Sequence, residues 1–65
     1  MTKIIRLPEV IQRTGLSRST IYMRISNQSF PDSINLGGRA VGWIENEVDE
    51  WIEKRIQLSR ELKIN

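Results

Sequence analysis

TGLSRSTIY, the sequence of residues 14–22, joins two short helices that the flanking residues predict. Gly15 supplies the left-handed cap that ends the first helix, and the Ser17 hydroxyl can accept from a free N–H of a helix beginning at Arg18. Two short helices joined by such a turn form a helix-turn-helix, whose second helix enters the major groove of DNA. The same spacing also occurs in plain helical domains, so this stretch alone leaves DNA binding open.

The two predicted helices span about residues 8–27. Pro8 suits the first helical position, where its missing N–H costs nothing, and Val10 begins a short apolar stripe. In the second helix, Ile21 and Ile25 form an apolar pair that faces the core. The remaining faces of this helix are polar or flexible and hold six candidate DNA contacts, which are Arg18, Ser19, Thr20, Tyr22, Met23 and Arg24.

Several of these candidates also have an ordinary structural interpretation. Arg18 could be a solvated residue of the first turn, and Arg24 could pair with an acidic residue of the last helix. The ring of Tyr22 could pack on the edge of the core, so that only its hydroxyl is exposed. The sequence leaves both interpretations open for each of the three.

Residues 34–44 predict a β-hairpin, because apolar residues alternate with others on both sides of a glycine pair. Those apolar residues are Ile34, Leu36, Val41 and Trp43. We expect all four to share one face, whether the two-residue turn is Gly37–Gly38 or Gly38–Arg39. Residues 3–6 are a candidate for a third strand beside this hairpin.

Arg39 lies at or beside the hairpin tip, between glycine and alanine. It has little apolar surface to cover there, so a purely structural role is a poor explanation for it. A hairpin that follows a helix-turn-helix and carries an arginine at its tip resembles a wing that reaches phosphates or a minor groove. Arg39 is therefore the seventh candidate DNA contact.

The last helix is predicted over about residues 46–60. Asn46 and Asp49 match a variant of the capping box, and an apolar stripe begins at Val48. We interpret both tryptophans, Trp43 and Trp51, as core residues. Farther along, a second subunit would be needed to cover the apolar side chains of Leu58, Leu62 and Ile64.

The composition excludes several classes of site. The chain has 65 residues and contains neither cysteine nor histidine, which rules out disulfides and zinc–thiolate or iron–sulfur sites, and leaves little basis for an enzyme. Residues 1–44 carry six basic and two acidic side chains, a net charge of +4, whereas residues 45–65 carry four basic and six acidic ones, a net charge of −2. With no long apolar segment and no signal-peptide pattern, we expect a cytoplasmic protein.

Five strings occur in one order and together identify a family: LPEV (7–10), TGLSRSTIY (14–22), FP (30–31), LGGRAVGW (36–43) and VDEWI (48–52). They closely resemble the AlpA family of prophage and genomic-island regulators, related to excisionases and to MerR-type winged helices. The chain departs from the family pattern at two places. Met23 stands where many relatives have arginine, and residues 27–29 lack the glycine often found before Phe30.

The resemblance implies one domain, residues 1–65, that is mainly α with a small β-hairpin and forms a MerR- or excisionase-like winged helix-turn-helix. It implies a sequence-specific transcriptional regulator near an integrase or excision locus, bound to double-stranded DNA in the bacterial nucleoid as a homodimer or as cooperative tandem copies. The alternatives are an excisionase-type directionality factor that bends DNA, and a protein-interaction module that docks through the C-terminal helix. No cofactor, metal, membrane or small-molecule ligand is expected.

Overall fold

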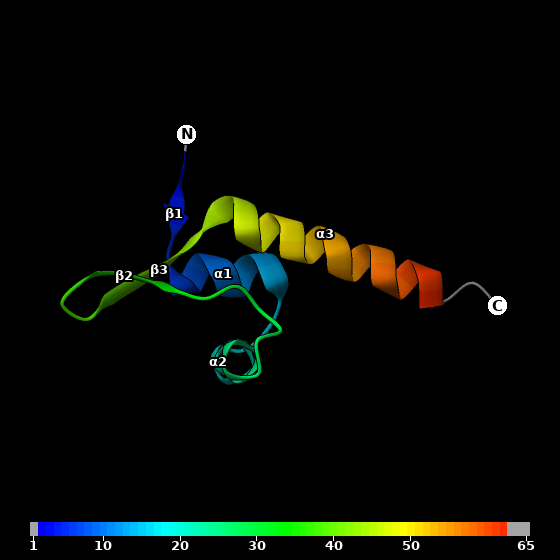
Figure 1. The fold of residues 1–65 in the computed structure, drawn as a ribbon, viewed down its shortest axis with the longest axis horizontal. Coiled ribbons are helices and arrows are strands. Elements are labelled where there is room, and N and C mark those ends of the chain that lie inside the picture. The colour runs from blue at the N-terminus through cyan, green and yellow to red at the C-terminus, as the bar shows by residue number, and fades with distance from the viewer. Residues whose placement is uncertain (1, 63–65) are drawn as a thin grey trace.

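The computed structural model describes residues 2–62 and is mostly helical, with one small antiparallel sheet (Figure 1). The elements, in chain order, are β1 (Ile4–Ile5), α1 (Leu7–Thr14), α2 (Arg18–Ser26), β2 (Ile34–Gly37), β3 (Ala40–Ile44) and α3 (Glu45–Leu62). The strand order is β1-β3-β2, so the first residues of the chain do add a third strand. These elements make up the predicted winged helix-turn-helix.

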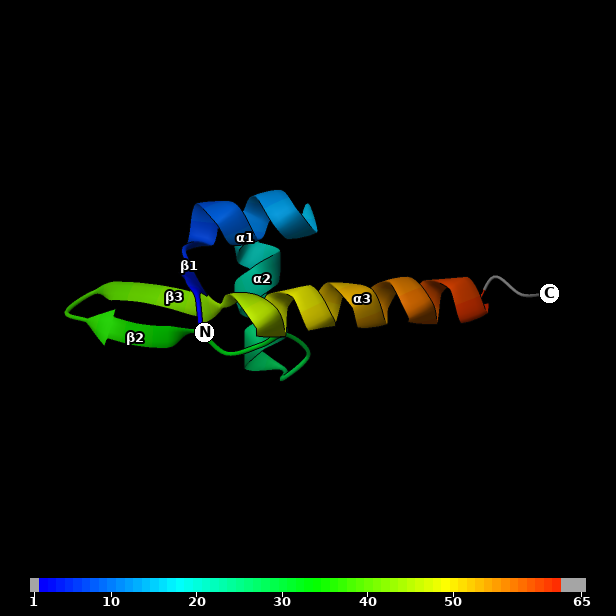
Figure 2. The ribbon, with the colours of Figure 1, turned by 90° about the horizontal axis from the view of Figure 1, so that it is seen from above.

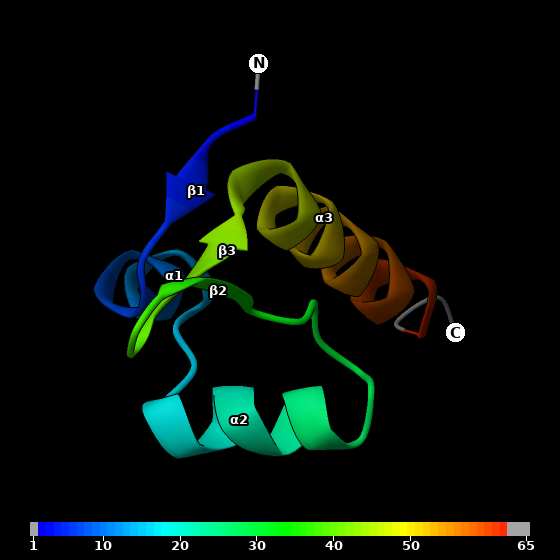
Figure 3. The same cartoon turned by 60° about the vertical axis from the view of Figure 1, so that its left-hand side comes forward.

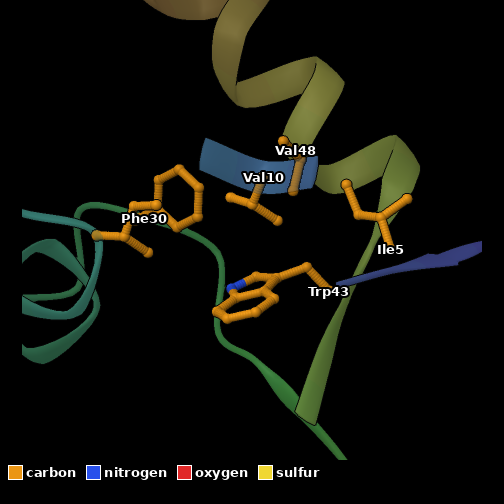
Figure 4. Close-up of a cluster of buried hydrophobic side chains, with 6 residues drawn as sticks. Ile5, Val10, Phe30, Trp43 and Val48 are labelled. Atoms are coloured by element: carbon orange, nitrogen blue, oxygen red, sulfur yellow. The ribbon is translucent and has the colours of Figure 1, made fainter. Parts of the chain in front are cut away.

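The core lies where the three helices meet the sheet. Its buried side chains are Ile5, Val10, Ile21, Phe30, Trp43 and Val48, five of which are labelled in Figure 4. Trp43 is fully buried, and its indole N–H donates to the Pro31 carbonyl at 3.2 Å, so burial leaves no donor unpaired. Every element except β2 contributes to this core, which fixes α2 relative to the hairpin.

The turn between α1 and α2 forms as its sequence predicts. Gly15 adopts the left-handed conformation, with φ of 72°, and its N–H donates to the Ile11 carbonyl at 2.8 Å. Ser17 caps α2, because its hydroxyl oxygen accepts from the Thr20 N–H at 3.2 Å. These local signals place both helix ends within a residue of the prediction.

The C-terminal end of α2 also uses a left-handed residue, in this case without glycine. Gln28 has a φ of 64°, and the Ser29 N–H donates to the Arg24 carbonyl at 2.8 Å. The chain therefore takes on a conformation that is costly for a residue with a Cβ.

The start of α3 differs from the prediction. The helix begins at Glu45, directly after β3, and Asn46 lies inside its first turn and is not its N-cap. The reason is the sheet: the Glu45 N–H donates to the Lys3 carbonyl beside β1 at 2.9 Å. This backbone partner satisfies one of the free donors at the helix start, so α3 needs no side-chain cap there.

The register of the hairpin also differs from the prediction. Ile34 pairs with Gly42 and Asn35 with Val41, but Gly37 pairs with Ala40, so Leu36 is an extra residue in β2. Ile34 therefore lies on the face of Gly42, opposite to that of Val41, and the predicted common face is wrong. The cause is local. The side-chain Oδ1 of Asn35 accepts from the Gly37 N–H at 2.7 Å, and Gly37, with φ of 113°, accommodates the bulge.

The hairpin and α3 project from opposite sides of the core, which gives the molecule extents of 49 × 28 × 19 Å (Figure 2). The two-residue turn of the hairpin is Gly38–Arg39, the second of the two predicted alternatives. The C-terminal half of α3 extends past α1 and α2. Within residues 2–62, no helix is both long and apolar enough to cross a membrane.

Candidate DNA-binding surface

Helix α2 lies at one side of the molecule, on the other side of the core from β1 and the start of α3 (Figure 3). Ile21 faces inward and is fully buried, so the opposite face of α2 is turned toward solvent. That face carries Ser19 in the first turn and Met23 in the next, with Met23 56% exposed, and Arg18 is exposed at the start of the helix on its flank. These three candidates are accessible to a large partner.

Tyr22 connects this surface to the sheet. Its ring packs edge-on against buried Trp43, with centroids 6.3 Å apart, and yet remains 38% exposed. The Arg18 guanidinium lies over the same ring, 5.8 Å from its centroid. The Tyr22 ring therefore packs on the edge of the core and also contacts a surface arginine. The structural and the functional interpretations of Tyr22 are thus compatible.

Thr20 is positioned differently from its neighbours. It is half-buried, and its hydroxyl oxygen accepts from the Ser17 hydroxyl at 2.9 Å. The backbone N–H of Thr20 donates to the hydroxyl oxygen of Ser17. Its polar groups are thus engaged in the N-terminal cap of α2. Thr20 lies at the edge of the exposed face and holds the helix start in place.

Arg24 lies on the flank of α2 that faces α3. Its guanidinium is 6.0 Å from the ring centroid of Trp51, and its Nε atom is buried without a hydrogen-bond partner among the described residues. It forms no ion pair with an acidic residue in the described part of α3. The structure therefore does not bring Arg24 together with Arg18, Ser19 and Met23.

Arg39 occupies the tip of the wing, where it is exposed between two left-handed glycines and Ala40. No hydrogen bond or ion pair holds its side chain to residues 2–62. The wing extends beyond the body that contains α2 (Figure 1). A guanidinium at this place is free to meet a phosphate or a groove edge.

Arg6 makes a contact with the wing that sequence reasoning missed. The Nε–H of Arg6, the residue before α1, donates to the Val41 carbonyl in β3 at 2.8 Å. This bond ties β3, two residues from Arg39, to the start of the helix-turn-helix. The two residues are 35 positions apart, and no local pattern marks such a pair.

An acidic cluster lies between α1 and the start of α3. The Arg13 guanidinium binds Glu9 at 2.6 Å, Glu45 at 2.7 Å and Asp49 at 3.0 Å. The hydrogen bonds that Arg13 donates to Glu45, to Glu9 and to Asp49, in decreasing order of effect, raise the pKa of Arg13 above its ordinary value, although partial burial opposes this. Three of the acidic side chains are thus engaged away from the exposed face of α2.

These carboxylates are bound to an internal cation, and among residues 2–62 no cluster of His, Cys, Asp or Glu is suited to hold a metal ion. The chain also contains no histidine, which is the most common general base of enzymes. The exposed features described above are a helix with a polar face and an arginine-tipped wing.

The comparisons with known proteins point to one family. The family model of the prophage CP4-57 regulatory protein, AlpA, matches residues 3–56. The DNA-binding transcriptional activator AlpA of Escherichia coli (strain K12) is 47% identical over 62 residues, covering 86% of this chain and 89% of the activator. The uncharacterized protein ORF88 of Enterobacteria phage P4 is 46% identical over 54 residues, covering 83% of this chain and 61% of the phage protein. Because the model spans most of the chain and the activator is so similar, this protein belongs to the AlpA family of prophage regulators.

Proposed function

We propose that this protein binds double-stranded DNA in a sequence-specific manner and regulates transcription of a prophage or genomic island, near an integrase or excision locus. The observation that supports this most strongly is the pairing of the exposed face of α2 with Arg39 at the wing tip. The name of the Escherichia coli relative, a DNA-binding transcriptional activator, supports the same role. By that similarity, activation is the proposed output.

The dimensions of α2 suit the major groove. An α-helix with its side chains is about 10–12 Å in diameter, and the groove is about 12 Å wide. In this arrangement Ser19 and Met23 face base edges, while Arg18 binds a phosphate or the edge of a guanine. Arg39 reaches the backbone or the minor groove from the wing.

The other three candidates take supporting roles in this proposal. The Tyr22 hydroxyl contacts DNA while its ring remains against Trp43, and Thr20 contacts a phosphate from the helix start. Arg24 would have to leave the face of Trp51 to reach DNA. We therefore propose that Arg24 contributes to DNA binding through a long-range attraction rather than through a base contact.

A single domain of this size makes few base contacts, so useful specificity requires more than one copy on the DNA. We propose binding as a homodimer or as tandem cooperative copies. Leu58 and Leu62, which are 49% and 80% exposed, are the apolar side chains available for contacts between copies. DNA binding would place the protein in the cytoplasm, on the nucleoid, in a regulatory and not a catalytic role.

The test is fluorescence anisotropy with labelled DNA from the region upstream of the gene, over a range of salt concentrations. The intact protein should bind at micromolar concentration or tighter, with an affinity that falls as salt rises, because each phosphate contact releases condensed counterions. Absence of any salt-dependent binding would overturn the proposal.

Arg39→Ala should weaken binding to all sequences alike and reduce the slope of log affinity against log salt by about 0.9. Lys54→Ala is the matched control, since it removes one exposed positive charge from α3 and should leave the slope nearly unchanged. Equal effects of the two substitutions would show that only net charge matters and that the wing makes no contact.

A further inference from the structure

A groove separates the helix-turn-helix from the projecting half of α3. It has a volume of about 450 Å³, far more than the roughly 30 Å³ that one water molecule occupies, so it can accept several side chains. The lining residues that matter here are Leu16 from the turn, Arg24 from α2, and Ile52, Arg55, Ile56 and Arg60 from α3. We call this the arginine groove.

The arginine groove concentrates positive charge that has no internal counterpart. Arg24 and Arg55 lie 6.0 Å and 5.8 Å from the ring centroid of Trp51, which places two guanidinium groups around one indole. Within the described part of the chain, no carboxylate lies within ion-pair distance of Arg24, Arg55 or Arg60. The buried Nε–H of Arg24 also lacks an acceptor.

Arg13 also lines the groove, and unlike the other three arginines it has carboxylate partners. It already binds three carboxylates from its own chain and is therefore unavailable to a partner. The other three guanidinium groups present the planar donor fork that carboxylates fill with two parallel hydrogen bonds. The charge of the groove is thus complementary to acidic side chains.

The apolar side chains of the groove distinguish its partner from nucleic acid. Leu16 and Ile52 are half-buried on its floor, and Ile56 is 40% exposed along its wall. A phosphate backbone has no apolar group to place against them, whereas an amphipathic peptide does. Arg24 also points away from the exposed face of α2 that we assign to DNA.

We propose that the arginine groove binds an acidic, amphipathic segment of another protein. Aspartate or glutamate side chains of the segment pair with Arg24, Arg55 and Arg60, and its apolar side chains cover Leu16, Ile52 and Ile56. Because the groove is separate from the α2 face and the wing, a copy bound to DNA can hold this segment at the same time. The protein would then join a DNA site to an acidic partner.

The test measures the anisotropy of three fluorescein-labelled short peptides with the intact protein, in the absence of DNA. The first alternates leucine with glutamate, the second replaces each glutamate by lysine, and the third replaces each leucine by serine. We expect saturable binding of the first peptide only. Arg55→Glu and Arg60→Glu should each weaken that binding about tenfold or more, since each reverses a charge that pairs with the peptide.

Lys54→Glu is the control, because it makes the same change of charge on α3 outside the groove. It should change the peptide affinity by less than about twofold. Arg55 and Arg60 are exposed, so circular dichroism should show unchanged helix content in all three variants. The peptide comparison on the unmodified chain tests the proposal independently of any substitution.

Three results would overturn the proposal. The first is equal binding of the glutamate–leucine and glutamate–serine peptides, which would show that the groove attracts any negatively charged peptide and does not contact apolar side chains. The second is an Arg55→Glu effect on DNA affinity as large as that of Arg39→Ala, which would make the groove a DNA contact. The third is dissociation of a dimer by Arg55→Glu in sedimentation, which would make it a contact between copies. DNA binding is measured separately, so either proposal can fail alone.

Discussion

Gly42 shows how one residue controls the packing of the sheet. A Cβ built at this position would collide with Cγ2 of Ile4 and lie 3.1 Å from the carbonyl oxygen of Ile5 and 3.2 Å from Cδ1 of Leu36. β3 is the central strand, so the side chains of both neighbouring strands close over this glycine. The bulge at Leu36 is what brings its side chain there.

Gly42→Ala should therefore destabilise the protein by about 1–3 kcal/mol, because the added methyl group forces Ile4 and the β1 backbone to move. Urea denaturation followed by circular dichroism measures the free energy of unfolding. Adding Ile4→Ala to this variant should recover part of the loss, since it removes the atom that collides. An unchanged unfolding midpoint for Gly42→Ala would show that β1 is not held against β3 as described.

Met23 tests base recognition by a single side chain. Met23 is exposed on α2, so Met23→Ala should leave folding unchanged. The variant should lose an apolar contact with a base edge in the major groove of DNA. Binding selection from a random DNA pool should show weaker preference at one base position, with a cost of about 1–3 kcal/mol there and no change in salt dependence. Gln57→Ala, which shortens an exposed side chain of similar length on α3, is the control. Uniform weakening at all positions would contradict a base contact by Met23.

At the scale of elements, local signals predicted α1 and α2 well. Gly15 ends α1 and Ser17 begins α2 through contacts within four residues, which a sequence displays directly. The register of the hairpin and the start of α3 could not be read in this way. The bulge depends on Asn35 and Gly37 acting together, and the Glu45 N–H finds its partner in Lys3, 42 residues earlier.

The candidate site follows the same division. Arg18, Ser19, Met23 and Arg39 are exposed as helical periodicity and turn chemistry predicted. Arg24 lies against Trp51, and Arg6 is bonded to the wing, because tertiary packing of α3 and β3 decides where these two long side chains lie. A single sequence carries no sign of such packing, so neither contact was predicted.

At the scale of the whole molecule, Arg13 joins α1 to α3 by binding three carboxylates. Its raised pKa means that its contribution to stability is complete at every pH below the ordinary pKa of arginine and is lost only at a pH above its folded value. Arg13 itself therefore adds no pH dependence to stability near neutrality.

Arg13→Ala should destabilise the protein at neutral pH, because Glu9, Glu45 and Asp49 then repel one another without a cation between them. The deficit relative to the unmodified protein should shrink as salt is added, because salt screens both this repulsion and the attraction that is lost. Thermal unfolding of both proteins over a range of salt concentrations measures the deficit. A deficit that is constant with salt would mean that the Arg13 side chain matters only for packing.

The basic and the acidic parts of the chain lie at different places in the fold. The basic part supplies α2 and the wing, and three of the acidic groups are gathered by Arg13 on the other side of the core. The two surfaces that a DNA duplex would meet are thus free of that cluster. The central claim is that DNA contacts α2 and the wing tip.

The most direct measurement of that claim is the change in backbone amide NMR shifts when duplex DNA from the upstream region is added to labelled protein. The largest changes should fall on residues 18–23 of α2 and on the turn at Gly38 and Arg39. The amides of Glu9 and Glu45, beside the Arg13 cluster, should change little. The opposite pattern, with the cluster shifting and α2 and the turn unaffected, would contradict the account.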